Sequence, residues 1–235
     1  MKFFVTEDVF AKIPDAQFGL VSVNGADNHG MNAEVEAFLQ EGVKACEEFY
    51  GGKKVKNEPE LQPYREAFRN IGINPNRYMC AIEALMTRIA KGQGMPVINT
   101  IVDLGNAVSL KYHLPIGVHD LDTMEGSFGV RISVEGDTFL PFGAEEREPV
   151  EPGEVVYASG SKVRTRRWTW RQGVEGQMTE ETTHMLFIID GFDSNLDLIL
   201  EARAELAELC AKYLGGVVKT GLINKDAMEY ETEVE

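Results

Sequence analysis

The sequence predicts an α+β fold, with helices mainly in the first half and at the C-terminus. Antiparallel or mixed β-sheets are expected in the second half. Apolar residues recur at helical spacing through much of the first 112 residues, whereas short β-rich runs separated by Gly, Pro and acidic clusters follow residue 128. The two patterns are segregated along the chain instead of alternating, which is typical of α+β proteins and not of βαβ sheets.

The first half is expected to contain two short strands and four helices. Gly51 and Gly52 end the first of these helices, and Pro63 fits only the first turn of the second. A turn around Asn74 and Pro75 precedes the third helix. In chain order, the expected segments are strands 2–5 and 18–23, then helices 33–50, 61–71, 79–89 and 98–112.

The second half is expected to contain five strands and one closing helix. Gly, Pro and acidic residues separate the strands. Asp193 or Ser194 caps the helix, and Gly215 with Gly216 ends it. The expected segments are strands 128–134, 138–142, 155–159, 163–171 and 185–190, then helix 196–214.

Length and composition indicate one folded domain over residues 1–235. The chain has 235 residues, of which 43% are hydrophobic, and shows no repeat or long linker. No apolar run is long enough for a membrane helix, and the first residues lack the apolar region of a signal peptide. Cys46, Cys80 and Cys210 form no paired framework, so we expect a reduced, cytoplasmic protein without a membrane partner.

The formal net charge of −15 argues against a general nucleic-acid-binding protein, which needs a basic face. Residues 226–235 hold five acids and no base, and are expected to form an acidic tail. Residues 155–174 hold five bases and no acid, and are the one basic island noted in the sequence.

Common catalytic and cofactor motifs are missing from the sequence. It contains no GxSxG, HExxH, CxxC, GxGxxG or GxxxxGK[ST] pattern. The group His119, Asp120 and Asp122 is too tightly spaced and too incomplete for a zinc site. We therefore expect no metal and no cofactor.

One candidate site lies on the helix expected at 98–112. Asn99, Asp103, Asn106 and His113 fall within one sector of a helical wheel. A solvated face is one interpretation, but short amide and carboxylate groups also orient a bound polar ligand. Gly105 lowers helix stability by about 1 kcal/mol, which indicates close approach by a backbone or a ligand.

A second candidate site is the stretch 162–172. Read as a strand, it places Arg164, Arg166 and Trp168 on one face, which could stack on bases and pair with phosphates. The alternative is that the Trp rings belong to the core and the Arg side chains pair with acids. Arg171, on the other face, could hold a substrate carboxylate.

Residues 64–122, from YREAFRNIG to HLPIGVHDLD, together with GEVVYASGSKVRTRRWTWRQ and HMLFIIDGF, resemble the B3/B4 domain of the phenylalanyl-tRNA synthetase beta subunit in its free-standing form. The similarity is strongest over 64–192. It implies a layered α+β fold of unusual topology. In the synthetase, this domain removes tyrosine wrongly attached to phenylalanine tRNA. Nothing in the chain resembles the aminoacylation core, so no ligase activity is expected.

The resemblance carries over residue by residue. The editing-site Asn of the family matches Asn106, and the Thr that often precedes it is Gly105 here. The family His falls on Gly117, and His119 lies two residues further on. The acidic residue near the end of the pattern falls close to Asp190. The pocket is therefore expected to persist with altered chemistry.

The resulting assignment gives His119 and Asn106 catalytic roles. Arg164, Arg166 and Trp168 are assigned to RNA binding. The residues assigned to substrate binding are Asp103, Asn99, Gly105, Gly117, Arg171 and Asp190.

Three functions remain open at this stage. The first is hydrolysis of mischarged aminoacyl-tRNA in trans, with tRNA as the partner. The second is a binding module or enzyme for a free amino-acid-like molecule, without tRNA. The third is a protein-interaction module anchored by the Arg/Trp strand. Oligomeric state is not predicted.

Overall fold

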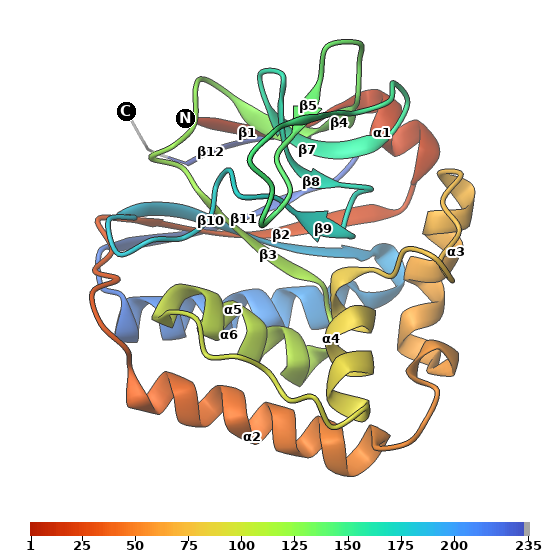
Figure 1. Ribbon diagram of the computed structural model, residues 1–235. Helices are drawn as coiled ribbons and strands as arrows, with labels where there is room; N and C mark the ends of the chain where they lie inside the picture. The colour runs from red at the N-terminus through yellow and green to blue at the C-terminus, as the bar shows by residue number, and fades with distance from the viewer. Residues whose placement is uncertain (233–235) are drawn as a thin grey trace.

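The computed structural model describes residues 1–232 and contains two stacked β-sheets, with helices covering the outer face of the smaller sheet (Figure 1). The larger sheet has the strand order β12-β1-β4-β7-β8-β5-β6, with β9 paired to β8. The smaller sheet has the order β11-β2-β10-β3 and is antiparallel throughout. The expected α+β class with antiparallel and mixed sheets is confirmed.

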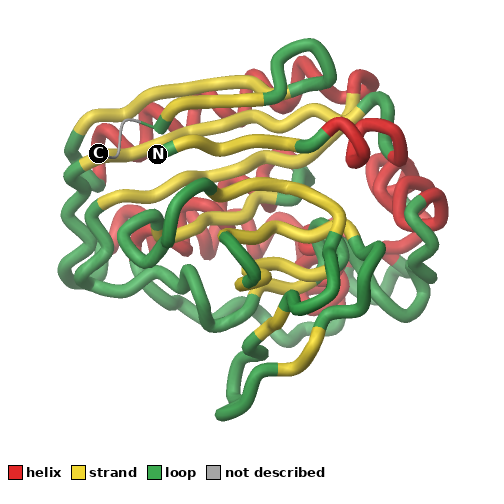
Figure 2. Tube along the Cα trace, turned by 90° about the horizontal axis from the view of Figure 1, so that it is seen from above, coloured by secondary structure: helices red, strands yellow, loops and turns green. Residues whose placement is uncertain are grey.

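The strands of the larger sheet come from both ends and the middle of the chain. They are β1 (Lys2–Val5), β4 (Phe128–Ile132), β5 (Thr138–Phe139), β6 (Glu148–Pro149), β7 (Val155–Ser159), β8 (Lys162–Arg166), β9 (Arg171–Gln172) and β12 (Glu229–Glu231). The smaller sheet consists of β2 (Ala16–Asn24), β3 (Ile116–Asp120), β10 (His184–Phe192) and β11 (Val217–Ile223). Figure 2 shows the strands above a layer of helices.

The helices are α1 (Glu7–Lys12), α2 (Ala33–Tyr50), α3 (Gln62–Asn70), α4 (Ala81–Ala90), α5 (Thr100–Tyr112) and α6 (Leu196–Tyr213). Helices α5 and α6 lie against the smaller sheet, and α2 lies below them as an outer layer (Figure 1). Over residues 1–232, no helix has the length and apolar character needed to cross a bilayer.

The central strand β10 is buried on both faces, which explains its continuous apolar sequence. Leu186, Ile188 and Phe192 belong to the core between the two sheets. Phe187 and Ile189 face the other way and pack with α5 and α6. Because side chains alternate along a strand, residue 190 must point between the sheets, into an apolar core.

Several local expectations were wrong. The expected strand 163–171 is interrupted after Arg166 by a turn, and resumes only as β9. Helix α1 and the strands β3, β6, β11 and β12 were not expected. Within the described part of the acidic stretch 226–235, β12 pairs with β1, where Phe3 lies opposite Tyr230. Residues 233–235 of that expectation lie outside the described residues.

A buried ion pair joins α3 to α4. Arg65 and Glu83 contact each other at 2.5 Å, with 5% and 1% of their surfaces exposed. Arg65 also donates to the Pro75 carbonyl and to Asn76 Oδ1. The pair fixes α4 beside the sheets, where the helix forms one wall of the cavity described below.

We predict that Arg65→Met destabilises the protein by about 3–5 kcal/mol, because it leaves the Glu83 carboxylate buried without its partner. Urea denaturation followed by circular dichroism measures this difference. Arg69→Met on the same helix is the control, since Arg69 is exposed, and it should change the free energy of unfolding by less than about 0.5 kcal/mol. Equal effects of the two substitutions would contradict the assignment.

Candidate functional site

A cavity of about 440 Å³ lies between α4, α5 and the edge strand β3. Its lining is mostly apolar and includes Ile98, Ile116 and Met178. The polar side chains among the described lining residues are Arg88, Asn106, Gln172 and Gln177. A concave, largely apolar site with a few polar groups is the usual form of a small-molecule pocket.

Helix α5 places Asn106 in this cavity. Within residues 1–232, no protein group hydrogen-bonds to its side-chain amide. The preceding residue, Gly105, lies against β10: a Cβ there would be 3.3 Å from the Phe187 ring. The glycine thus lets the helix approach the sheet closely. Asn106 is left with one donor group and one acceptor group available to a ligand.

Asn99 and Asp103 support the cavity from behind. Asn99 caps α5 by accepting from the Val102 N–H at 3.0 Å, and its amide donates to the Met178 carbonyl at 3.4 Å. Asp103 is 1% exposed and accepts from the Ile98 N–H at 3.1 Å. Burial raises the pKa of Asp103. Both side chains fix the segment that closes the cavity, and neither lines it.

His113, the fourth member of the predicted sector, does not belong to the site. It ends α5 in the left-handed conformation, with φ at 53°. Its Nδ1 lies 3.2 Å from Glu60, and its ring packs on Tyr50. A helical wheel assumes that the helix continues through residue 113. Because α5 ends at Tyr112, the wheel does not give the direction of the His113 side chain.

A smaller chamber of about 90 Å³ adjoins the cavity, and the two share Ile116, Gly117 and Gln172 as walls. The chamber lies between the two sheets. Its other polar lining residues are His119, Tyr157, Thr165, Trp168, Thr169, Trp170, Arg171 and Asp190. We call the cavity and the chamber together the recess; both are lined by β3, which pairs with β10.

Asp190 is the buried acid of the chamber. The Tyr157 hydroxyl and the Trp168 indole N–H, the latter at 2.7 Å, both donate to its Oδ1. Within residues 1–232, no donor contacts Oδ2. Burial raises the pKa of Asp190 to about 7, although both hydrogen bonds favour the ionised form.

A strained turn brings Trp168 to this carboxylate. Arg167 and Trp168 have φ values of 51° and 57°, a conformation that costs about 1–2 kcal/mol per non-glycine residue. The Trp168 N–H donates to the Val155 carbonyl at 2.7 Å. The Arg167 guanidinium packs over the rings of Tyr78 and Trp170, at 4.2 and 4.5 Å. Strain of this kind is concentrated at functional sites.

His119 lies two residues after Gly117, on the same face of β3. Its ring stacks on Tyr157 at 5.5 Å, and it is 2% exposed. Burial, reinforced by the nearby Arg164 guanidinium, lowers the pKa of His119 to about 3. The Nε2 atom faces Gly117, where a Cβ would lie 3.6 Å away, and Nδ1 has no partner within residues 1–232. A neutral imidazole with this pKa is a weak base.

The expectation of an exposed face at Arg164, Arg166 and Trp168 is wrong. Trp168 is fully buried, and the two arginines are 2% and 9% exposed. Arg164 donates to Thr123, and Arg166 pairs with Glu148 and Glu154. The core interpretation of this stretch is therefore the one that the structure supports. A buried Trp168 is not available as the anchor of a protein-interaction module.

Sequence reasoning missed Tyr157 and Gln172 as members of the site. Tyr157 alternates with Val156 and Ala158 on a wholly buried strand, so periodicity gives no sign that its hydroxyl meets an acid. Gln172 ends the stretch 162–172, and its side chain donates to the Val118 carbonyl at 3.0 Å. Only the stacking of the two sheets brings these residues together.

Comparisons with known proteins identify the family of the chain. The family model of the B3/4 domain matches residues 63–205, so the chain belongs to the B3/4 domain family. It is similar to the phenylalanine–tRNA ligase beta subunit of Oceanobacillus iheyensis, with 24% identity over 97% of this chain and 30% of that protein. The chain thus spans about a third of the length of this relative.

Among solved structures, the chain is similar to an N-terminal fragment of the phenylalanyl-tRNA synthetase beta subunit from Pyrococcus horikoshii. The TM-score is 0.46, at 10% identity, and the match covers 92% of this chain and 49% of that one.

We predict that the stability of the protein falls with rising pH because of Asp190. Its pKa is raised in the folded state, so this group contributes stability fully below about pH 4, its unfolded pKa. The contribution is lost as pH rises to about 7. Against Asp190→Asn, the free energy of unfolding of the wild type should fall by up to about 1.4 kcal/mol per pH unit between these limits.

Urea titrations at a series of pH values measure this difference. Asp197→Asn is the control, because Asp197 is exposed at the start of α6. The difference in the free energy of unfolding between Asp197→Asn and the wild type should not change with pH over the same interval. Parallel curves for wild type and Asp190→Asn would show that Asp190 titrates normally.

Proposed function

We propose that the chain hydrolyses the ester between an amino acid and the 3′ end of a transfer RNA, acting in trans. The observation that carries this proposal is the unpartnered Asn106 amide, in a cavity that shares Ile116, Gly117 and Gln172 with the chamber of Asp190. The relative is a phenylalanine–tRNA ligase beta subunit by name, and this chain covers 30% of it. Such a substrate places the activity in the cytoplasm.

In the proposed reaction, water adds to the ester carbonyl carbon and the bond to the ribose oxygen breaks. The proton lost by the water ends on that oxygen, so the products are a free amino acid and RNA with a free hydroxyl. The proposed hydrolysis is direct, with no covalent intermediate. Asn106 orients the water or the carbonyl, and the rate enhancement comes from this positioning.

In this proposal His119 is a hydrogen-bonding group and not a base, although the sequence assigned it a catalytic role. Because its pKa lies near 3, it does not accept a proton efficiently from the attacking water at neutral pH. Its Nε2 faces the space that Gly117 leaves open, so it serves as a hydrogen-bonding group in the recess. Gly117 lines both cavity and chamber and contributes no side chain to either.

The chamber is proposed to hold the side chain of the amino acid. Asp190 Oδ2 offers an acceptor with no donor of its own, and Thr169 Oγ1 is buried without a partner within residues 1–232. A site built to hydrogen-bond a hydroxyl rejects the analogue that lacks it, since its polar groups are then left unpaired. An amino acid with a hydroxyl on its side chain fits this chamber best.

One observation favours the second candidate, a binding module or enzyme for a free amino-acid-like molecule. Arg171 is exposed at the chamber wall and forms no ion pair within residues 1–232. A guanidinium in this position suits the carboxylate of a free amino acid, a group that is esterified in aminoacyl-tRNA. Salt dependence separates the two, because a tRNA complex weakens steeply with salt and a zwitterion complex does not.

The first experiment is deacylation of tyrosine-charged phenylalanine tRNA beside a panel of other mischarged tRNAs. We expect Asn106→Ala to lower the rate by about 10²-fold, the usual loss when one group that stabilises the transition state is removed. Asn70→Ala is the control, since Asn70 is exposed at the end of α3 and remote from the recess. It should keep the wild-type rate.

Failure to release any amino acid, in protein shown to be folded, would overturn the hydrolase proposal. Isothermal titration with free tyrosine, phenylalanine and related amino acids then tests the second candidate. Binding that disappears in Arg171→Gln would support it.

We predict that Asp190→Asn changes which amino acid is released. If Oδ2 accepts from a substrate hydroxyl, the rate ratio of tyrosyl to phenylalanyl ester should fall at least about tenfold, or about 1.4 kcal/mol. Tyr157→Phe, which removes only a donor to Oδ1, should change this ratio less. An unchanged ratio in Asp190→Asn would place the side chain of the substrate elsewhere.

A further inference from the structure

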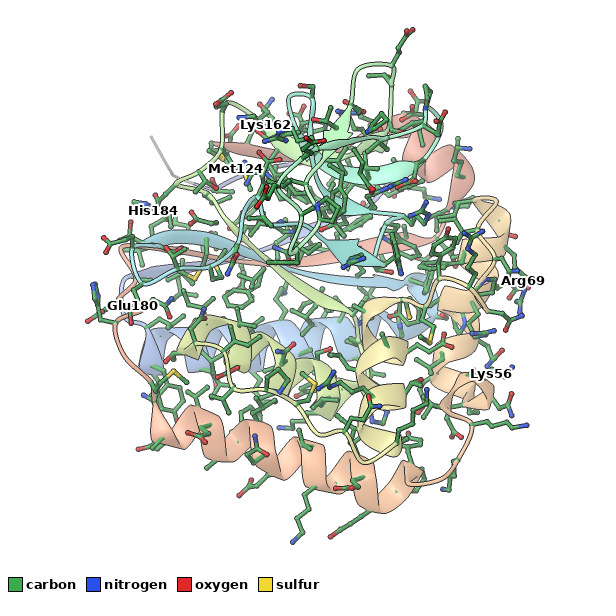
Figure 3. All side chains as sticks on the ribbon, in the orientation of Figure 1. Lys56, Arg69, Met124, Lys162, Glu180 and His184 are labelled. Atoms are coloured by element: carbon green, nitrogen blue, oxygen red, sulfur yellow. The ribbon has the colours of Figure 1, made fainter. Side chains whose placement is uncertain are left out.

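Exposed basic side chains of this acidic protein are concentrated outside residues 155–174, the basic island identified from the sequence. Residues 53–91 contain eight bases and four acids, although the whole chain has a net charge of −15. Figure 3 shows Lys56 and Arg69 on the same side of the molecule, near α3 and α4. By contrast, Arg164 and Arg166 of the predicted island are buried.

Four lysines line a separate recess of about 270 Å³ beside α4. They are Lys53, Lys54, Lys56 and Lys91, and the buried Arg65 lies at its wall. All four are exposed, and none forms an ion pair with a carboxylate within residues 1–232. These ammonium groups are therefore available to an anionic partner.

Two acids of the same segment have partners other than these lysines. Glu60 accepts from the Tyr50 hydroxyl at 2.7 Å and lies 3.2 Å from His113. Glu83 lines the recess and pairs with the buried Arg65 at 2.5 Å, so these two charges offset each other and the four lysines remain. At about 0.1 M salt, charges beyond roughly 10 Å are largely screened, so these local groups decide the potential here.

Helix α4 connects the recess to the proposed active site. One face of the helix gives Leu85 and Arg88 to the large cavity, and another gives Thr87 and Lys91 to the basic recess. Arg88 Nε donates to the Gly94 carbonyl at 2.9 Å, which fixes the guanidinium at the cavity wall. The loop that carries the lysines is joined to the end of α4 by a hydrogen bond from Gly52 to Ala90.

We propose that Arg88, Lys91, Lys53, Lys54 and Lys56, the basic strip, bind the phosphodiester backbone of the RNA whose 3′ end enters the large cavity. This inference rests on the proposed function. The recess is lined from Met79 to Lys91 and so follows the whole of α4, whose 10 residues span about 15 Å. That length exceeds a single phosphate and suits successive nucleotides of one strand.

The test measures binding of unfractionated tRNA by fluorescence anisotropy between about 50 and 300 mM salt. In the triple variant Lys53→Gln, Lys54→Gln and Lys56→Gln, the slope of log affinity against log salt should become shallower by about two. The dissociation constant at about 100 mM salt should rise on the order of tenfold. The matched control, Lys12→Gln, Lys44→Gln and Lys225→Gln, removes the same charge from exposed sites elsewhere and should leave both values unchanged.

A second substrate separates this inference from the hydrolase proposal. An aminoacylated CCA trinucleotide reaches the cavity without the remote phosphates, so the triple variant should hydrolyse it at the wild-type rate. It should release the amino acid from full-length tRNA more slowly. The two proposals can fail separately. If the triple variant loses RNA binding but the wild type hydrolyses no ester, RNA binding by the basic strip is supported and the hydrolase proposal is overturned.

Three results would overturn the basic strip. They are no binding of tRNA by the wild type, equal salt slopes in the two triple variants, and equal loss of affinity in both. The last would assign the attraction to net charge alone.

Discussion

The architecture of the site depends on one buried carboxylate. Asp190 lies on the central strand of the smaller sheet, and its Oδ1 is held by Tyr157 and Trp168 from the larger sheet. The Tyr64 hydroxyl donates at 2.9 Å to the backbone carbonyl of the same residue, which ties α3 to this point. An ionised group in an apolar core would be very costly without such partners, and even with them the pKa rises to about 7. The two sheets are thus joined where the chamber opens.

Other features of the recess follow from this junction. Trp168 reaches Asp190 only because the chain makes a strained turn after β8. The same turn places Thr169 and Arg171 at the chamber wall. On β3, Gly117 lines both cavity and chamber and contributes no side chain to either. Strain in the turn is offset by hydrogen bonds and by the stacking of Arg167. Preorganisation of this kind suits a site that works by positioning.

Buried and exposed basic side chains differ in their partners. Arginines inside the fold pair with acids or with carbonyl groups, as Arg166 does with Glu154. The lysines of the loop before α3 have no such partners within residues 1–232 and remain exposed beside α4. An acidic protein can therefore offer a local basic surface, since screening limits each charge to its surroundings. The fold decides that these lysines are available, because Glu83 pairs with the buried Arg65 and Glu60 accepts from the Tyr50 hydroxyl.

The sequence by itself determined the α+β class, the helices α2 to α6 within a few residues, and the strands with clear period-two patterns, because these depend on local periodicity and caps. The ordered resemblance also determined the family and drew attention to Asn106 and Asp190. Tertiary structure alone decided that Trp168 is core, that His113 leaves the site and that residues 229–231 pair with β1. It also joined Tyr157 to Asp190. These features depend on strand pairing and sheet stacking between distant segments, and no local pattern encodes which residue lies opposite another.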